Sequence, residues 1–474
     1  MSEVSELPEY DAVIIGAGLS GLTAAWRLRE ADKRVRVIEA RPRVGGRTYT
    51  SALAGESVDL GGQWIGPTQD RVLALCRYLG LETYEQHYAD GKGKQRKDRL
   101  LEFAGEVRRY RGFLPKIPVF ALAELGVTIA RIDAMARKVP RDAPWLAAKA
   151  REWDAISVEA WLAAHVRSHG AHVIIKAATE AIFAEHPRGL SLLYFLHYIH
   201  CGGGLERLAE VREGAQNWRI RGGTQQLSER LVERIGPEHL SLEDPVRAIE
   251  QDQDGVTVIS ARGRTRARRA ILDLAPAMAR TIEFSPALSP ARADLHELMP
   301  MGSVIKCIAA YPRAFWRSAG LSGESVSESL KLRMSFDGCG PDWGSKAEPA
   351  AKAAGSQARL VAFALGDEAR ELGALSAEAR KAAVVADLVR LFGPEAGEPS
   401  HYVDLDWAAE PWSGGCYVGL LPPGRLPILG PALREVQGKI HFAGTEAATR
   451  WVGYLDGAIE SGERAAAELA LAIC

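Results

Sequence analysis

The chain has 474 residues, of which 47% are hydrophobic and 25% charged, and its formal net charge is −1. This composition is typical of a globular protein that is long enough for two cores. The balanced charge argues against a nucleic-acid partner, and we interpret the basic run from Arg262 to Arg269 as an exposed hairpin edge.

Neither a targeting segment nor a metal site is expected. Residues 1–9 are acidic and polar, and no apolar run reaches the roughly 18 residues that a membrane span needs. The six cysteines lack CxxC spacing. We therefore expect free thiols in a reducing compartment, and so a cytoplasmic protein with no metal and no membrane anchor.

The N-terminal segment carries a nucleotide-binding pattern. Residues 10–15 predict a buried parallel strand, a glycine-rich turn follows, and residues 22–29 have helical apolar spacing. Such a turn lets a pyrophosphate approach the backbone at the helix N-terminus. The next strand ends on Glu39, where a carboxylate can accept ribose hydroxyls; the alternative is a glycine loop with a solvated glutamate. The glycines of the turn are Gly16, Gly18 and Gly21.

The residues that follow favour FAD over NAD. Residues 41–47 (RPRVGGR) place guanidinium groups and glycine backbone beyond the ribose carboxylate, suited to a second approach on the pyrophosphate. Residues 59–64 (DLGGQW) add a close-approach glycine pair and a tryptophan able to lie near a flat ring. The alternative for the arginines is a solvated charge run. The expected cofactor residues here are Arg41, Gly46, Arg47, Gly62, Gln63 and Trp64.

The C-terminal part closes the cofactor site. Residues 440–446 (IHFAGTE) predict a strand running into a tight turn, and a helix with a small-residue face follows through Leu471. Its N-terminus would direct partial positive charge at a flavin pyrimidine. We place Gly444 and Glu446 in the cofactor site, together with Val246 and Trp407.

The predicted fold is α/β with α+β insertions, and its cofactor domain is discontinuous. Residues 1–85, 220–300 and 401–474 are expected to form a Rossmann-like FAD-binding domain. Residues 86–219, which are mainly helical, and residues 301–400, where β-like runs alternate with helix, are expected to form the substrate-binding domain.

In this order the motifs resemble the flavin-dependent amine oxidases, and specifically the monoamine oxidases, over nearly the whole chain. The resemblance implies a two-domain flavoprotein of the p-hydroxybenzoate-hydroxylase-like kind. Animal members continue into a C-terminal membrane helix, whereas this chain stops before one. The motifs that carry the resemblance are residues 16–21, 43–48, 59–62, 66–69 (GPTQ), 302–307 (GSVIKC), 413–417 (SGGCY) and 442–446 (FAGTE).

The resemblance also implies catalytic roles for four residues. Tyr417 and Tyr454 match two tyrosines that flank the amine in front of the flavin. Lys306, in an apolar strand where an unpaired ammonium is costly, matches a lysine that holds a water at flavin N5 and assists the reaction with oxygen. Gln216 matches a glutamine that orients the substrate. As isolated residues, these would be ordinary core, surface or snorkelling side chains.

Cys416 matches the cysteine that monoamine oxidases join to the flavin 8α-methyl as a thioether. A thiolate must attack that methyl group, and the flanking glycines let the backbone approach it. Because many relatives lack this cysteine, noncovalent FAD stays open.

The predicted function is therefore FAD-dependent oxidation of primary or secondary amines, with molecular oxygen as second substrate and aldehyde, ammonia and hydrogen peroxide as products. The apolar run Leu192 to Leu196 favours aryl-alkyl monoamines. A polyamine or diamine oxidase, for which Glu324 could supply a carboxylate, and an L-amino-acid oxidase remain alternatives, as does a non-catalytic flavin-binding partner protein. The sequence allows a homodimer without specifying one.

Overall fold

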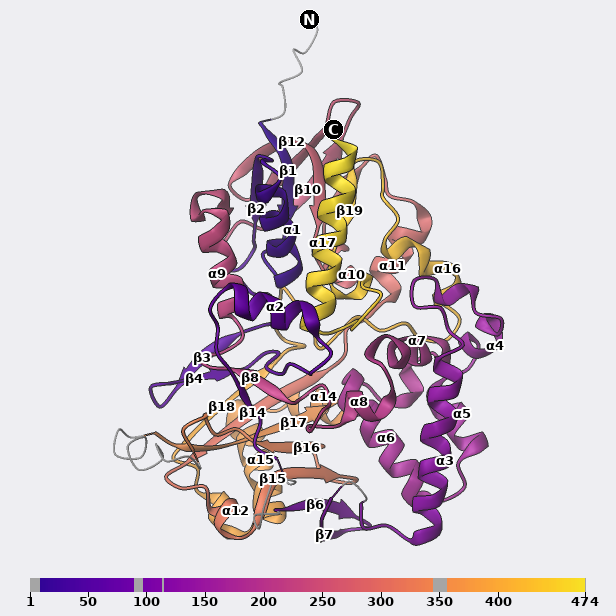
Figure 1. Ribbon diagram of the computed structural model, residues 1–474, viewed down its shortest axis with the longest axis vertical. Helices are drawn as coiled ribbons and strands as arrows, with labels where there is room; N and C mark the ends of the chain where they lie inside the picture. The colour runs from indigo at the N-terminus through magenta and orange to yellow at the C-terminus, as the bar shows by residue number, and fades with distance from the viewer. Residues whose placement is uncertain (1–8, 89–96, 113–114, 344–355, 474) are drawn as a thin grey trace, which may run out of the picture.

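The computed structural model describes residues 9–88, 97–112, 115–343 and 356–473. Cys474, one of the six predicted free thiols, lies outside these ranges. Figure 1 shows one sheet with its helices at the top, and below it a second sheet on the left beside a group of helices on the right.

The first sheet is mixed and branches at its longest strand, which pairs in parallel with both the N-terminal strand and the last strand of the chain. Its strands, in spatial order, are β13 (Glu283–Ser285), β10 (Val246–Gln251), β11 (Val256–Ser260), β12 (Gly263–Leu272), β1 (Tyr10–Ile15), β2 (Val35–Ile38) and β9 (Leu240–Ser241), with β19 (Ile440–Phe442) beside β12.

The second sheet is antiparallel except for one parallel pair, between its fifth and sixth strands. Its strands, in spatial order, are β18 (His401–Asp406), β14 (Val304–Tyr311), β17 (Ala358–Leu365), β16 (Met334–Asp337), β15 (Leu321–Ser327), β6 (Asp98–Phe103) and β7 (Glu106–Tyr110). Two small ribbons are β3 (Thr50–Leu53) with β4 (Glu56–Asp59), and β5 (Thr83–Glu85) with β8 (Trp218–Ile220).

The helices fall into three groups. Those on the first sheet are α1 (Leu19–Glu30), α2 (Asp70–Tyr78), α9 (Gln226–Ile235), α10 (Pro276–Ala279), α11 (Pro290–Leu298), α16 (Leu426–Leu429) and α17 (Leu455–Ala472). The helical lobe holds α3 (Val119–Ala136), α4 (Ala150–Asp154), α5 (Val158–His165), α6 (His169–Phe183), α7 (Leu192–Gly202) and α8 (Leu205–Ala209). Beside the second sheet lie α12 (Phe315–Ser318), α14 (Asp367–Gly373) and α15 (Ala377–Phe392).

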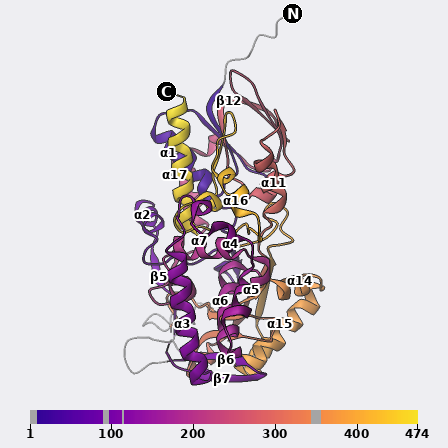
Figure 2. The same cartoon turned by 90° about the vertical axis from the view of Figure 1, so that its right-hand side faces the viewer.

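The β1–α1–β2 unit forms as predicted, and glycines set its geometry. Gly16 has φ +105°, and a Cβ there would lie 2.4 Å from the carbonyl oxygen of Asp273. The first and last helices, α1 and α17, lie side by side in Figures 1 and 2. A Cβ at Gly462 of α17 would lie 2.2 Å from the carbonyl oxygen of Ser20. Only a residue without a Cβ allows the two backbones to meet this closely.

One sequence interpretation holds for part of its segment, and one domain boundary moves. In the run Arg262 to Arg269, residues 263–266 of β12 form one arm of a hairpin with β11, as predicted, whereas the described pairing with β1 begins only at Ala267 and brings the end of the run into the sheet. Its side chains meet carboxylates, as Arg264 does at Glu250 (2.7 Å). Strand β18, which opens the segment 401–474, pairs with β14 in the second sheet; we therefore propose that the cofactor domain resumes after this strand.

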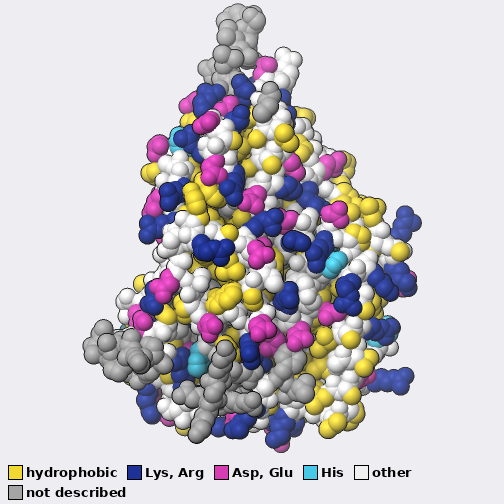
Figure 3. Space-filling view, in the orientation of Figure 1, with side chains coloured by type: hydrophobic (Ala, Val, Ile, Leu, Met, Phe, Trp, Pro, Cys, Tyr) yellow, Lys and Arg dark blue, Asp and Glu magenta, His cyan; other side chains and the backbone are white. Residues whose placement is uncertain are grey.

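The face shown in Figure 3 carries side chains of both charges interspersed. Apolar side chains gather at its lower right, over α3, where Val119, Phe120 and Val127 are exposed. Within the described ranges, no helix is both long and apolar enough to cross a bilayer.

Candidate active site

A continuous cavity runs between the first sheet and the helical lobe, and its walls come from all parts of the chain. One part, which we call the nucleotide part, is lined by the β1–α1 turn, the end of β2 and the segment after β12. The other part is lined by α6, α7, α8, β16 and β17. The predicted site residues that line it are Gly16, Gly18, Glu39, Arg41, Gly46, Arg47, Gly62, Gln63, Trp64, Gln216, Val246, Cys416, Tyr417, Gly444 and Tyr454.

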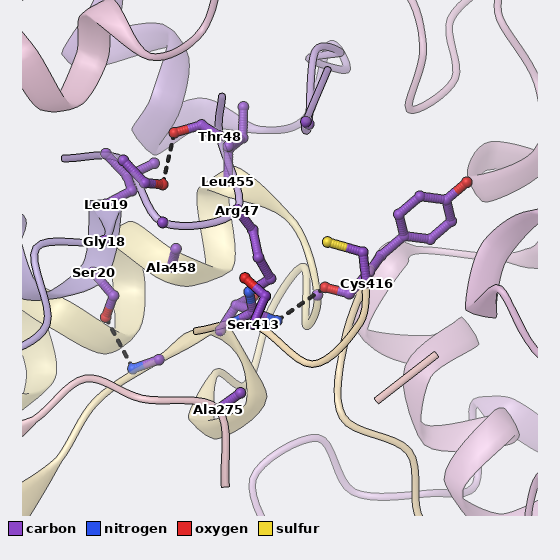
Figure 4. Close-up of a pocket in the computed structure, with 18 of the residues that line it drawn as sticks. Gly18, Leu19, Ser20, Arg47, Thr48, Ala275, Ser413, Cys416, Leu455 and Ala458 are labelled. Atoms are coloured by element: carbon purple, nitrogen blue, oxygen red, sulfur yellow. Dashed lines mark hydrogen bonds between the residues drawn. The ribbon is translucent and has the colours of Figure 1, made fainter. Parts of the chain in front are cut away.

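At the nucleotide part of the cavity, Glu39 is buried and held by backbone donors. The N–H of Ala17 donates to Oε2 (2.8 Å) and the N–H of Arg41 to Oε1 (2.9 Å). Each carboxylate oxygen keeps further acceptor capacity for a hydroxyl. Ser20, at the start of α1, accepts from the N–H of Gly444 (3.0 Å; Figure 4). The first turn of α1 is thus joined to the C-terminal segment.

Asp273 lies in the same region and was not predicted. It follows β12, lines the cavity and accepts a hydrogen bond from the N–H of Gly21 (2.6 Å). Burial raises the pKa of this carboxyl to about 7. In the sequence it resembles an ordinary residue at the end of a strand, so only its position beside α1 identifies it.

Arg47 links the glycine loop to the C-terminal turn. It ion-pairs with Glu446 (2.6 Å) and donates to the carbonyl oxygen of Tyr417 (2.9 Å), the bond drawn beside Cys416 in Figure 4. Glu446 also accepts from the N–H of Gly419 (3.1 Å). Although burial acts against its charged form, Arg47 keeps the pKa of the Glu446 carboxyl below its usual range. Glu446 therefore positions Arg47 from behind the wall.

The other two arginines of the loop have different partners. Arg41 reaches Glu410 (2.5 Å) and the hydroxyl of Ser413 (2.8 Å), so it holds the segment before Cys416. Arg43 instead donates to backbone carbonyls of its own loop and lies 4.2 Å from the ring of Tyr49. The alternative of a solvated charge run does not hold, because these side chains are engaged by protein groups.

Lys306 is buried on β14 and does not line the cavity directly. Its ammonium donates to Oε1 of Gln63 (2.5 Å) and to the carbonyl oxygen of Gly61 (2.9 Å). It also lies 5.7 Å from the ring of Trp64. Burial lowers the pKa of Lys306 to about 7. The lysine thus reaches the cavity wall through Gln63, whose Nε2 is buried without a partner among the described residues.

Tyr417 and Tyr454 both line the cavity. Burial raises the pKa of each phenol, so both are neutral at physiological pH. Tyr454 lies between Trp451 (5.0 Å between ring centroids) and Tyr198 of α7 (6.1 Å). Beside Tyr417, the thiol of Cys416 is buried, and burial raises its pKa to about 12, while Arg47 and Arg41 act to lower it.

Gln216 lines the cavity, and only one of the two polar groups of its side-chain amide has a hydrogen-bond partner among the described residues. Its Nε2 donates to the carbonyl oxygen of Leu208 (3.1 Å), whereas Oε1 is buried without a partner in the described part of the chain. A buried acceptor in this state is costly unless a ligand or water satisfies it.

Besides Lys306, three predicted site residues do not belong to the described lining of the cavity. Gly21 packs on the backbone of Gly16, Glu446 holds Arg47, and Trp407 donates to the carbonyl oxygen of Leu60 (2.9 Å).

The predicted apolar run Leu192 to Leu196 is also misplaced, because it packs in the core of the helical lobe; Tyr198, further along α7, lines the cavity instead. Glu324 is outside the lining too, and Arg99 neutralises it (2.5 Å). Residues that sequence reasoning missed include Ile182, Phe336 and Phe363. Their apolar side chains look like any core residue, so the sequence held no signal for them.

The residues at the nucleotide part fit a dinucleotide cofactor. A Cβ at Gly16 would lie 2.4 Å from the carbonyl oxygen of Asp273, and one at Gly18 would lie 3.0 Å from its carboxylate. The start of α1 supplies N–H donors, and Glu39 offers acceptor capacity on the cavity wall. Helix N-termini of this kind stabilise phosphate. The unsatisfied Nε2 of Gln63 offers a donor at the junction of the two parts. Among the described residues, no cluster of histidine, cysteine and carboxylates could hold a metal.

Comparison with known proteins gives the same class. Residues 19–470 match the family described as "Flavin containing amine oxidoreductase". The chain is 36% identical to a probable flavin-containing monoamine oxidase A of Dictyostelium discoideum, over 97% of each chain. It is 38% identical to a putative flavin-containing monoamine oxidase of Mycobacterium tuberculosis, over 97% of this chain and 96% of the relative.

Solved structures agree. Cyclohexylamine oxidase from Brevibacterium oxydans superposes with a TM-score of 0.90 at 34% identity, covering 98% of this chain and 99% of that one. Putrescine oxidase bound to putrescine gives the same TM-score and coverage at 32% identity. The chain therefore belongs to the flavin-containing amine oxidase family. It has the family's Rossmann-like FAD-binding fold with a substrate domain, and it is an enzyme of oxidative amine deamination whose cofactor is FAD.

Proposed function

We propose that this enzyme oxidises primary and secondary monoamines with an aryl-alkyl side chain. The observation that carries the proposal is the lining of the cavity around α6 to α8, β16 and β17. Among the described residues this lining holds no carboxylate, lysine or arginine. A diamine would need a carboxylate for its distal ammonium, and an amino acid would need a cation for its carboxylate.

The proposed roles of the chain follow from the geometry. Tyr417 and Tyr454 form the sides of an amine slot, and Oε1 of Gln216 accepts a hydrogen bond from the amine. Facing rings would favour an ammonium by cation–π attraction, but burial disfavours charge and selects the neutral amine that oxidation requires.

FAD held by the glycine turn and Glu39 would supply two-electron oxidation at the amine α-carbon, with oxygen as the final electron acceptor. The balanced reaction converts amine, oxygen and water into aldehyde, ammonia (or the shorter amine) and hydrogen peroxide. Lys306, hydrogen-bonded to Gln63, holds positive charge near the site where oxygen is reduced.

The test is peroxide release from the FAD-loaded protein with benzylamine, phenethylamine, cyclohexylamine, putrescine and an L-amino acid. We expect the two aryl-alkyl amines to give the highest kcat/KM. A higher value for putrescine or the amino acid would contradict the proposed substrate class. Peroxide from none of them would favour a non-catalytic flavoprotein.

We also propose that Cys416 bonds covalently to the flavin. The cysteine lines the cavity beside Tyr417; burial raises the pKa of its thiol to about 12, and Arg47 and Arg41 act against that rise, toward the thiolate that the bond requires. Acid-denatured protein should then keep its yellow chromophore on a peptide containing residues 413–417, whereas Cys416→Ala should release free FAD. Complete release of FAD from the native protein would show that Cys416 is only a buried thiol.

A further inference from the structure

A buried ion pair lies behind the wall of the part of the cavity that α6, α7, α8, β16 and β17 line, which we call the amine part. Glu180 of α6 faces Arg333, which precedes β16, with Oε2 of the glutamate 3.4 Å from Nε of the arginine. Their side chains are only 3% and 7% exposed. Neither belongs to the described lining of the cavity.

The neighbours of these two residues do line it. Ala181 and Ile182 follow Glu180 on α6, and Met334 follows Arg333 on β16. The backbone N–H of Arg333 donates to the carbonyl oxygen of Phe363 (2.8 Å), which is also in the wall. The ion pair therefore connects two wall segments that come from different elements.

The two partners are held unequally. Arg333 also meets the carboxylate of Glu368 on α14 and the carbonyl oxygen of Glu328. Glu180 has, besides Arg333, the ammonium of Lys176 one turn earlier on α6, at 3.6 Å. Burial raises the pKa of Glu180 to about 7, with Arg333 and Lys176 acting to lower it and Glu368 to raise it. Removing the Glu180 charge thus leaves Arg333 with acceptors of its own.

We propose that the Glu180–Arg333 ion pair fixes the spacing between α6 and β16 and so selects amines by the size of their side chains. The proposal rests on the proposed function, because it needs the amine to occupy this part of the cavity. Glu180 is then a positioning residue that acts through Ala181 and Ile182. An apolar pocket discriminates by about tenfold or more for each methylene it accepts or rejects.

The experiment compares kcat/KM for a series from n-butylamine to n-decylamine in the native enzyme and in Glu180→Gln. The variant keeps the shape of the side chain but lacks the charge. We expect the ratio of long-chain to short-chain kcat/KM to rise by about tenfold, mainly through KM, while kcat for the best substrate changes little. A structural role alone would lower the melting temperature without moving this ratio.

A pH series gives an independent measurement. Linear alkylamines share nearly the same ammonium pKa, so the long-to-short ratio cancels substrate ionisation. Below about pH 7 Glu180 gains a proton and its pull on Arg333 weakens. The ratio should therefore rise in the native enzyme as the pH falls through 7, and it should be flat in Glu180→Gln.

Two variants complete the design. Glu395→Gln removes the partner of Arg313 in an exposed ion pair and should leave the ratio unchanged. If Glu180→Gln does not fold, Arg333→Lys keeps the charge but loses the fork of donors, and should move the ratio in the same direction. A native ratio in the folded variant overturns the proposal, and so does a native enzyme that turns over benzylamine but none of the linear amines; the absence of turnover of benzylamine and phenethylamine in the native enzyme contradicts the proposed function instead.

Discussion

At the scale of single residues, the charge of Lys306 depends on its burial. Its pKa of about 7 means that the ammonium is present below neutral pH and is lost as the pH rises. The same depression means that the unfolded chain binds this proton more tightly. Lys306 therefore costs the folded state no free energy above the ordinary lysine pKa. As the pH falls from that value toward 7, the free energy of unfolding decreases, because the unfolded chain takes up the proton first.

Oxygen reactivity should follow that charge. If the cation assists oxygen reduction, the rate of reoxidation of reduced enzyme should fall as the pH rises through about 7. Lys306→Met should slow reoxidation by about tenfold or more and remove the pH dependence, while anaerobic reduction by amine stays near the native rate. Stopped-flow traces of the two half-reactions measure this; equal slowing of both would mean that Lys306 is structural.

Glu39 offers a second test on a single side chain. Its carboxylate is the buried acceptor on the nucleotide wall, and it also orders the backbone through Ala17 and Arg41. In a Cys416→Ala background, Glu39→Ala should weaken FAD by about 1–3 kcal/mol, read by flavin fluorescence titration. Glu30→Ala, on the exposed end of α1, is the matched control. Native affinity in Glu39→Ala would exclude a ribose contact.

At the scale of elements, the contact of α1 with α17 depends on missing side chains. A Cβ at Gly462 would meet the carbonyl oxygen of Ser20 at 2.2 Å, and Ser20 is bonded to Gly444 in the cavity wall. Gly462→Ala should therefore lower the free energy of unfolding by about 1–3 kcal/mol and weaken FAD binding. Urea unfolding and FAD titration measure the two effects.

The control for this change is Gly126→Ala. Gly126 lies on an exposed face of α3, and a Cβ there would meet nothing within 4 Å. Because alanine is the better helix former, this variant should gain up to about 1 kcal/mol. If Gly462→Ala were equally stabilising, the two helices would not be in close contact.

Elements with a clear local pattern were predicted well. The strand Tyr10–Ile15 has the predicted bounds, and in residues 301–400 strands such as Val304–Tyr311 alternate with helices such as Ala377–Phe392, as predicted. Apolar periodicity and flanking turns are local signals. Pairings between distant segments had no such signal. The parallel contact of β6 with β15 and the joining of β18 to β14 depend on tertiary packing that no short window contains.

The candidate site divides in the same way. Gly16 and Gly18 could be predicted from the glycine-rich turn, because a close approach of a ligand to the backbone requires glycine in any context. By contrast, Asp273 and the Glu180–Arg333 pair lie in segments where a charged residue normally meets solvent. Only the fold brings them to a buried wall, so their roles become visible only in three dimensions.

At the scale of the whole molecule, the cofactor part of the cavity is assembled from segments far apart in the chain, between Ile15 and Ala458. A ligand that contacts all of them binds only the folded state, so it must stabilise the molecule by mass action. In Cys416→Ala, FAD at about 100 times its Kd should raise the free energy of unfolding by about 2.7 kcal/mol over the dialysed protein. Urea denaturation with and without FAD measures this. Equal midpoints despite measured FAD binding would mean that the unfolded chain binds FAD equally well, and that the separate segments do not jointly form the site.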